Sequence, residues 1–294
     1  AWAGAFGDTV TTLEQDPAGG YKPVTRFAQF VNVPELSVMV RQVMDVIGAA
    51  ELRRYVSLPN LKDGSRQMVL AEQTDRQAEY QEVLRARMTA IQRRSGPPKK
   101  GDDILLSVIG DGRKSAIDYR LIDAAAPREA GSKLERMIEE VARRHKEFSR
   151  TSFHAPLPGG SGYSEKPVTH GPATQMIFSD FGINGDFPVH KYIRNSLIER
   201  GVPANQIALI SEFKSHVAKQ RLFNDMNEGK VRVLIGSVAK MGTGVNAQKR
   251  LRAVHNMDAQ WYPANDTQRN GRIMRQGNMN PEIEILDYST KGTY

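Results

Sequence analysis

From residue 132 onward, apolar positions follow two alternating spacings. Short apolar, β-branched runs occur at 175–179, 206–210, 231–235, 253–257 and 282–286. Between these runs, apolar residues recur every three to four positions, which is typical of helices of roughly 10–15 residues. Because alternating strands and helices build βαβ units, the pattern predicts an α/β domain. Its parallel sheet should be covered by helices on both faces.

Punctuating residues mark where these helices begin and end. Ser132 followed three residues later by Glu135 is a capping box that predicts a helix start, and Ser215 predicts another. Pro188 in a first turn and Gly201 after the last apolar position bound a helix between them. A stretch at about 155–174 is rich in Pro, Gly and Ser, and we expect a flexible surface loop there.

The first 130 residues lack the strand–helix alternation. Asn32 and Pro34 begin a predicted helix, 66–72 is a candidate strand, and Thr74 begins a charged helix that breaks at 95–101. We therefore expect a mainly helical segment over 1–130 and the α/β domain over 131–294.

A polar block near the C-terminus is the strongest candidate for chemistry: Gln268-x-x-Gly271-Arg272-x-x-Arg275. On a helix, three-residue spacing places both guanidiniums on one face. A guanidinium is permanently charged and binds phosphate oxygens in a forked geometry. The block therefore predicts a pair of arginine fingers for ATP hydrolysis; the alternative is a solvated basic helix face.

A glycine-rich turn follows the predicted strand at 231–235 and contains Gly242 and Gly244. In open α/β sheets, ligands bind outside the carboxyl ends of the strands. Glycines at that edge let backbone amides approach a phosphate closely. Alone this signal is weak, but the arginine block downstream strengthens it.

Several expected parts of a nucleotide site are missing. A phosphate-binding loop needs Gly-x-x-x-x-Gly-Lys-Ser/Thr, and the only similar stretch, Gly110 to Ser115, has the wrong spacing and is predicted to be a plain turn. There is no Asp-Glu-x-His block to hold magnesium and no methyltransferase signature. The chain has no cysteine, and its histidines show no metal-ligand spacing, so we predict no metal site of its own.

The amino-acid composition indicates the class of partner. Lys and Arg number 41 against 33 Asp and Glu, a formal net charge of +8, which favours a polyanion such as DNA. No apolar run reaches transmembrane length and no signal peptide is present, so we expect no membrane partner and a cytoplasmic location. The start at Ala1, without an initiator methionine, suggests a fragment of a longer protein.

The order of these motifs resembles the C-terminal half of superfamily-2 helicases, in particular the Swi/Snf-like DNA translocases. Ser237-x-x-Lys240-x-Gly242-x-Gly244-x-Asn246 is similar to their motif V, and 175–181 to motif IV. Asp258-x-x-Trp261-x-Pro263 is similar to the segment before motif VI, and 268–275 to motif VI itself. The family often has a histidine before the second finger, where this chain has Met274.

The resemblance covers nearly the whole chain but is specific only after residue 175. Residues 1–130 resemble the tail of the first helicase lobe and a helical connector, and 131–294 the second RecA-like lobe. The stretches 27–47 and 110–116 most resemble large phage- and plasmid-encoded methyltransferase–helicase proteins linked to anti-restriction, which implies a bacterial, phage or plasmid source.

The resemblance also implies roles for single residues. Arg272 and Arg275 would reach the γ-phosphate, with Gln268 supporting them. On the nucleotide side, the residues implied are Gly242, Gly244, Asn246 and Gly271. Contacts to DNA backbone phosphates are implied for Ser179, Ser237 and Lys240. Trp261 would either stack on a base or, as we favour, brace the motif VI helix.

The implied function is that of an ATP-dependent DNA helicase or translocase whose C-terminal portion this chain supplies. ATP and Mg²⁺ would be bound mainly by the first lobe, which lies upstream, with or without a methyltransferase domain. Because this chain lacks a phosphate-binding loop, we expect it to be inactive alone. Two alternatives stay open: a RecA-like module that binds nucleic acid or a partner without ATPase activity, and a different nucleotide enzyme such as a kinase or nuclease.

Overall fold

The computed structural model describes residues 2–15, 21–45, 47–241 and 244–293. Contacts within the chain divide it into two units: Ala1–Leu52 with Glu82–Val108, and Arg53–Gln81 with Ile109–Tyr294.

The first unit contains an antiparallel hairpin of β1 (Gly7–Gln15) and β2 (Tyr21–Phe30). The same unit also contains α1 (Trp2–Phe6), α2 (Val33–Arg41) and α3 (Ala49–Leu52). The sequence predicted a mainly helical segment here, and this hairpin was not predicted. Threonines in both strands explain the hairpin: Thr11 lies opposite Thr25, and their hydroxyls are 2.7 Å apart.

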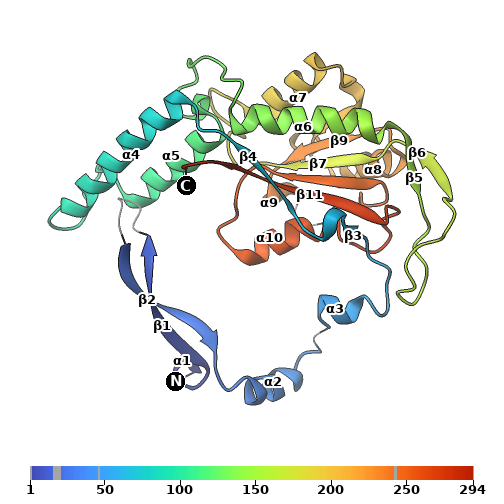
Figure 1. Ribbon diagram of the computed structural model, residues 1–294, viewed down its shortest axis with the longest axis horizontal. Helices are drawn as coiled ribbons and strands as arrows, with labels where there is room; N and C mark the ends of the chain where they lie inside the picture. The colour runs from blue at the N-terminus through green and yellow to red at the C-terminus, as the bar shows by residue number, and fades with distance from the viewer. Residues whose placement is uncertain (1, 16–20, 46, 242–243, 294) are drawn as a thin grey trace. The chain divides into compact units, whose positions relative to one another are not determined.

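The second unit is built on a seven-stranded sheet in which every pairing between described residues is parallel. The strand order is β3-β11-β10-β7-β9-β8, and β4 pairs with the later part of β11 (Figure 1). The predicted parallel α/β sheet is confirmed. Its strands are β3 (Asn60–Leu61), β4 (Gln67–Ala71), β7 (Thr174–Phe178), β8 (Ile207–Leu209), β9 (Val233–Gly236), β10 (Leu251–Asn256) and β11 (Glu282–Thr290).

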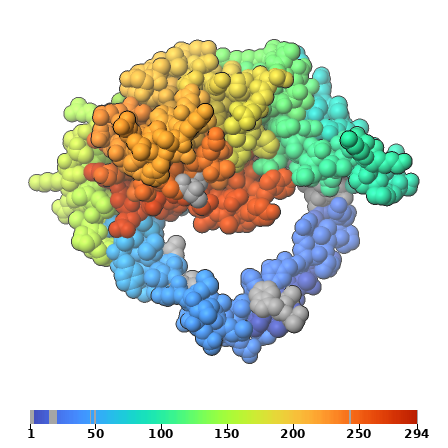
Figure 2. Space-filling model, turned by 180° about the vertical axis from the view of Figure 1, so that it is seen from behind, coloured from blue at the N-terminus to red at the C-terminus, as the bar shows by residue number. Residues whose placement is uncertain are grey.

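Two apolar clusters cover the two faces of this sheet. Ile177 packs with one cluster, whereas its neighbours Met176 and Phe178 pack with the other, as side chains alternate along a strand. The first cluster includes α6 (Lys133–Glu147) and α7 (Val189–Glu199). The second includes α8 (His216–Glu228) and α9 (Val238–Met241), and α8 lies at the surface of the face shown in Figure 2.

The remaining helices complete the element list. They are α4 (Asp75–Arg93), α5 (Leu105–Ile117) and α10 (Pro263–Asn270), with 3₁₀ turns at Lys62–Gly64, Tyr119–Leu121, Phe148–Arg150, Ala204–Gln206 and Ile210–Glu212. The predicted turn from Gly110 to Ser115 is wrong, because it lies inside α5. A glycine costs a helix interior about 1 kcal/mol, and burial of Ala116 and Ile117 offsets that cost.

Local signals placed most helix starts correctly. The Ser132 side chain accepts a hydrogen bond from the Glu135 amide, and the Ser215 side chain accepts one from Ala218, as the capping patterns predict. The segment expected to be a flexible loop carries β6 (Thr169–Gly171), which pairs with β5 (Thr151–Phe153).

A buried carboxylate ties the elements around α6 together. Glu135, 1% exposed, accepts hydrogen bonds from Arg120, Arg128 and Arg200. The Tyr192 hydroxyl on α7 also donates to it. Three guanidiniums therefore neutralise, and four donors hold, a charge that would be costly if it were buried alone.

Replacing Glu135 by Leu should destabilise the second unit by about 3–5 kcal/mol, because the arginine cluster would lose its buried counter-charge. Glu139→Leu, one turn further along α6, removes only an exposed pair with Arg136 and should cost at most about 1 kcal/mol. Urea unfolding of both variants measures the difference. Equal losses would contradict a structural role for the Glu135 cluster.

Candidate functional site

Three loops meet at the carboxyl edge of the sheet. They follow β7, β9 and β10 and begin at Ser179, Ser237 and Met257. Because parallel strands all end at the same edge, loops far apart in sequence become neighbours there. The motifs singled out in the sequence lie in these loops and in α10.

Two aspartates bind the three loops to one another. Asp258, after β10, accepts a hydrogen bond from the backbone N–H of Asp180, 2.9 Å away. The Asp180 carboxylate accepts the Val238 N–H at the start of α9 (2.8 Å) and the Gln260 side-chain amide (2.8 Å). Asp180 and Asp258 lie within the motifs found in the sequence, but the sequence predicted no role for them. The available signal was an acidic residue soon after each of two buried strands.

Burial shifts the pKa of two charged groups behind this edge. Asp258 is 5% exposed, and desolvation, with the neighbouring Asp180 charge, raises its pKa to about 6. Lys133, the first residue of α6, is also buried, and desolvation lowers its pKa to about 8 although the Asp258 charge opposes that shift. Neither residue was among the predicted site residues.

The glycine-rich turn follows α9. Lys240 lies on α9 and is exposed, while Gly242 lies outside the described residues. Gly244 has φ +70°, a left-handed conformation that favours glycine, and it is exposed. Asn246 is exposed, and its carbonyl accepts a hydrogen bond from the Asn227 side chain.

The two predicted serines are buried. Ser179 is fully buried and its hydroxyl donates to the Phe181 carbonyl, 3.4 Å away. Ser237 is 4% exposed, and its carbonyl accepts the N–H groups of Lys240 and Met241 in α9. Of the three residues predicted to contact DNA phosphates, Lys240 alone presents its side chain to solvent.

Trp261 contacts an arginine from α5. The Arg113 guanidinium lies 4.7 Å from the Trp261 ring and 4.8 Å from the Phe181 ring, and it donates to the Ala259 carbonyl. Trp261 is 59% exposed. The ring therefore joins the loops after β7 and β10 through Arg113.

The arginine block does not lie on one helix face as predicted. Helix α10 ends at Asn270, and Arg272 and Arg275 lie in the turns after it, while Gln268 is exposed on α10. Gly271 is the helix C-cap with φ −63°. Side chains outside α10 explain its early end, because Asn278 donates to the Ile273 carbonyl, 3.0 Å away.

The block lies against the segment that follows the glycine-rich turn. Arg275 donates to the Val245 carbonyl at 3.2 Å, and among the described residues no carboxylate lies within ion-pair distance of Arg275. Arg272 is partly buried, and desolvation together with the Arg275 charge lowers its pKa. Two guanidiniums close enough for the charge of Arg275 to lower the pKa of Arg272 suit an anion better than a cation.

The described residues do not offer a metal site or a membrane span. No group of three or more His, Cys, Asp and Glu side chains in this part of the chain is placed to hold a metal ion. Nor does any helix within the described ranges have the length and apolar character needed to cross a bilayer.

The shifted pKa of Asp258 predicts a pH dependence of stability. Below about pH 4 the carboxyl is protonated in both states; between about pH 4 and 6 the folded state keeps a proton that the unfolded state releases. The protonated Asp258 carboxyl thus contributes to the free energy of unfolding fully at low pH, and this contribution is lost as the pH rises through about 6. Its size is at most about 3 kcal/mol.

Asp258→Asn should remove this dependence. The free energy of unfolding of the wild type, relative to that of the variant, should therefore decrease as the pH rises from 4 to 6. Denaturant unfolding over that range measures it, with the exposed Asp186→Asn as the matched control. A difference that stays constant with pH would contradict the burial effect.

Comparison with known proteins finds a family match that covers the motifs after residue 186. Residues 186–277 match the family described as the helicase conserved C-terminal domain. No curated protein matches the chain.

Solved structures show weak likeness. The C-terminal part of the Fun30 ATPase domain has a TM-score of 0.49 and 14% identity, covering 80% of this chain and 87% of that one. The DUF1998 helicase MrfA bound to DNA has a TM-score of 0.33 and 14% identity (40% and 16% covered). The C-terminal domain of the DEAD-box protein Dbp5 has a TM-score of 0.30 and 18% identity (41% and 63% covered).

The family match and the fold coincide along the chain. The matched range runs from the residues before α7 to the end of the arginine block, and it lies within a parallel sheet flanked by helices. The second unit is therefore a parallel sheet flanked by helices, and residues 186–277 within it match the helicase conserved C-terminal domain.

Proposed function

We propose that this chain is the C-terminal portion of an ATP-dependent DNA translocase of the Swi/Snf-like branch of superfamily 2. The observation that carries the proposal is the pair Arg272 and Arg275. They neighbour each other, are partly buried, and lie within the range that matches the helicase family. The methyltransferase–helicase type remains part of the proposal on sequence resemblance alone.

In this proposal the two arginines stabilise negative charge in the transition state of ATP hydrolysis. As water attacks the γ-phosphorus and the bond to ADP breaks, negative charge increases on the departing and equatorial oxygens. Guanidiniums that are already fixed stabilise that charge with little reorganisation. Mg²⁺, bound mainly by residues upstream, would neutralise the β- and γ-phosphate oxygens.

The other motif residues have supporting parts in this proposal. Gly244 and the carbonyl of Val245, which holds Arg275, would couple the nucleotide side to the turn after α9. Lys240 on that helix is exposed and suits a DNA backbone phosphate, which is a contact that positions DNA without reading its sequence. Closing and opening of two lobes around ATP would then move the DNA.

Replacing Arg272 and Arg275 together by Ala in the intact protein should lower DNA-stimulated ATP hydrolysis by about 10³-fold or more, because the transition-state charge loses its partners. Steady-state phosphate release at saturating ATP and DNA measures the loss. The charge-matched control is Arg221→Ala with Lys249→Ala, two exposed residues outside the site. Normal turnover in the first double variant would contradict the proposal. The present chain, assayed alone, should be inactive.

Lys240→Ala should weaken DNA binding at every sequence and reduce the slope of log affinity against log salt by about one. Fluorescence anisotropy of a labelled duplex at several salt concentrations measures that slope, with Lys249→Ala as the control. An unchanged slope would remove Lys240 from the DNA contact.

A further inference from the structure

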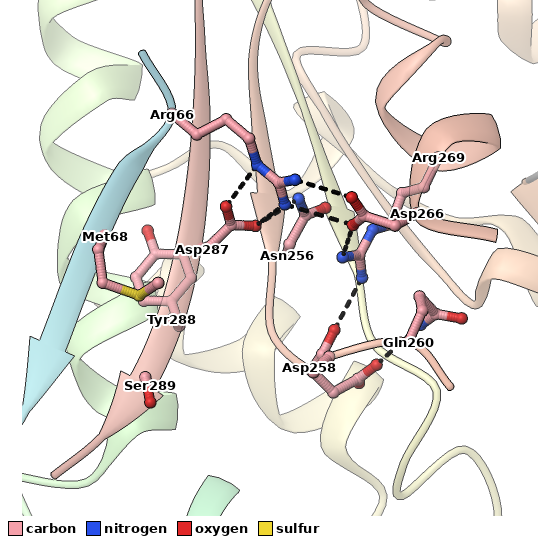
Figure 3. A pocket seen from close by; sticks show the side chains of 11 residues that line it. Arg66, Met68, Asn256, Asp258, Gln260, Asp266, Arg269, Asp287, Tyr288 and Ser289 are labelled. Atoms are coloured by element: carbon pink, nitrogen blue, oxygen red, sulfur yellow. Dashed lines mark hydrogen bonds and ion pairs between the residues drawn. The ribbon is translucent and has the colours of Figure 1, made fainter. Parts of the chain in front are cut away.

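Arg66 bridges two acidic residues that are far from it in sequence. Its guanidinium donates to Asp287 through Nε (2.6 Å) and Nη2 (2.7 Å), and to Asp266 through Nη1 (2.7 Å) and Nη2 (3.3 Å) (Figure 3). Asp266 lies on α10 and Asp287 on β11. One side chain next to β4 thus holds the helix before the arginine block against the sheet.

Two asparagines close this contact into a ring. Asn256, at the end of β10, donates to Asp287 (2.8 Å) and to Asn270 (3.0 Å), and Asn270 donates to Asp266 (3.1 Å). The ring of side chains therefore runs from Arg66 to Asp266, Asn270, Asn256, Asp287 and back to Arg66. All of its members except Asn270 line a cavity of about 520 Å³.

The ring fixes the end of α10 that precedes the arginine block. Asn270 is the last residue of α10, and Arg272 follows two positions later. The start of α10 is held less firmly, because its N-cap residue Tyr262 makes no side-chain cap and residues 261–264 are exposed. The orientation of the last turn therefore depends on the ring and on Arg269, which donates to Asp266 and to the Asp258 carbonyl.

We infer that Arg66 is a positioning residue for Arg272 and Arg275, an inference that rests on the proposed function. Both carboxylates that Arg66 binds are partly exposed, at 28% for Asp266 and 19% for Asp287. Without the guanidinium between them, the two charges repel and the end of α10 moves away from β11. A displacement of about 1 Å at a reacting group can cost about 10²-fold in rate.

The geometry also makes Arg66 hard to replace. A guanidinium is a planar fork with five donors and binds two carboxylates at once, whereas a lysine ammonium is a point charge on a flexible stem. Arg66→Lys should therefore keep part of the contact with the two carboxylates, and Arg66→Met should lose all of that contact.

The test uses the intact protein and compares Arg66→Met with Lys291→Met. Lys291 follows β11 and pairs with Glu72 next to β4, so the control breaks an exposed ion pair between the same two parts of the sheet without touching α10. Arg66→Met should lower kcat for DNA-stimulated ATP hydrolysis by 10- to 100-fold with KM for ATP changed less than about 2-fold. Arg66→Lys should be intermediate, and Lys291→Met should match wild type.

Combining Arg66→Met with Arg272→Ala separates this inference from the proposed function. Non-additive losses, with the double variant no slower than Arg272→Ala alone, support positioning through the arginine block. If Arg272→Ala abolishes turnover and Arg66→Met leaves kcat unchanged, the inference is overturned and the proposed function stands. If Arg272→Ala has no effect, both are overturned.

Hydrogen exchange on the present chain with Arg66→Lys is the second measurement, which does not need activity. The amides of residues 264–275 should exchange faster while those of β7 and β9 keep their protection. Uniform loss of protection would mean a general structural role, and unchanged exchange would mean no role; either result overturns the inference.

Discussion

The buried Asp258 carboxylate is the constraint on which the carboxyl edge of the sheet depends. A charge with little solvent is costly, and it persists because the Asp180 N–H and the Gln260 amide donate to it. Asp180 passes the connection on to the first turn of α9. Loops separated by nearly 80 residues thus share one hydrogen-bond network, so the glycine-rich turn and the approach to α10 are set by the same pair of carboxylates.

Buried ion pairs and apolar packing both stabilise the second unit. Neighbouring residues of β7 pack into opposite clusters, so the sheet requires helices on both faces. Polar side chains then determine where each helix packs on the sheet. Glu135 joins α6 and α7, and Arg144 on α6 pairs with Glu284 of β11 at 2.7 Å, both almost fully buried. Burial supplies most of the driving force, while the buried ion pairs specify the arrangement.

Local patterns in the sequence predicted the sheet well. The strands near 175, 207, 233, 251 and 282 and the helices that begin after Ser132 and Ser215 were found because their apolar spacing and caps are local signals. The β1–β2 hairpin was missed because its strands are largely exposed and lack an apolar face. The helix at Gly110 was missed because its two glycines predict a turn, whereas the burial that stabilises the helix is not visible in the sequence.

The candidate site was only partly predictable because its geometry depends on long-range contacts. The sequence identified Arg272 and Arg275 and the turn at Gly244, but not that α10 ends at Asn270, since Asn256 and Asn278 act from other elements. The partnership of Asp180 with Asp258 and the bridge from Arg66 each span long stretches of chain with no local pattern to reveal them. Gly242 lies outside the described residues, so its part stays a prediction.

The pairing of β3 and β4 with β11 has a consequence for where this chain can be divided. Motif positions suggest a boundary near residue 130, yet residues 60–71 supply the outer neighbours of the last strand. A chain that starts at residue 131 would remove the partners of seven of the nine residues of β11 along one side. Such an open, partly apolar edge is a template for pairing with other chains, so the shortened domain would tend to self-associate. The folding unit of this lobe thus begins upstream of its recognisable motifs.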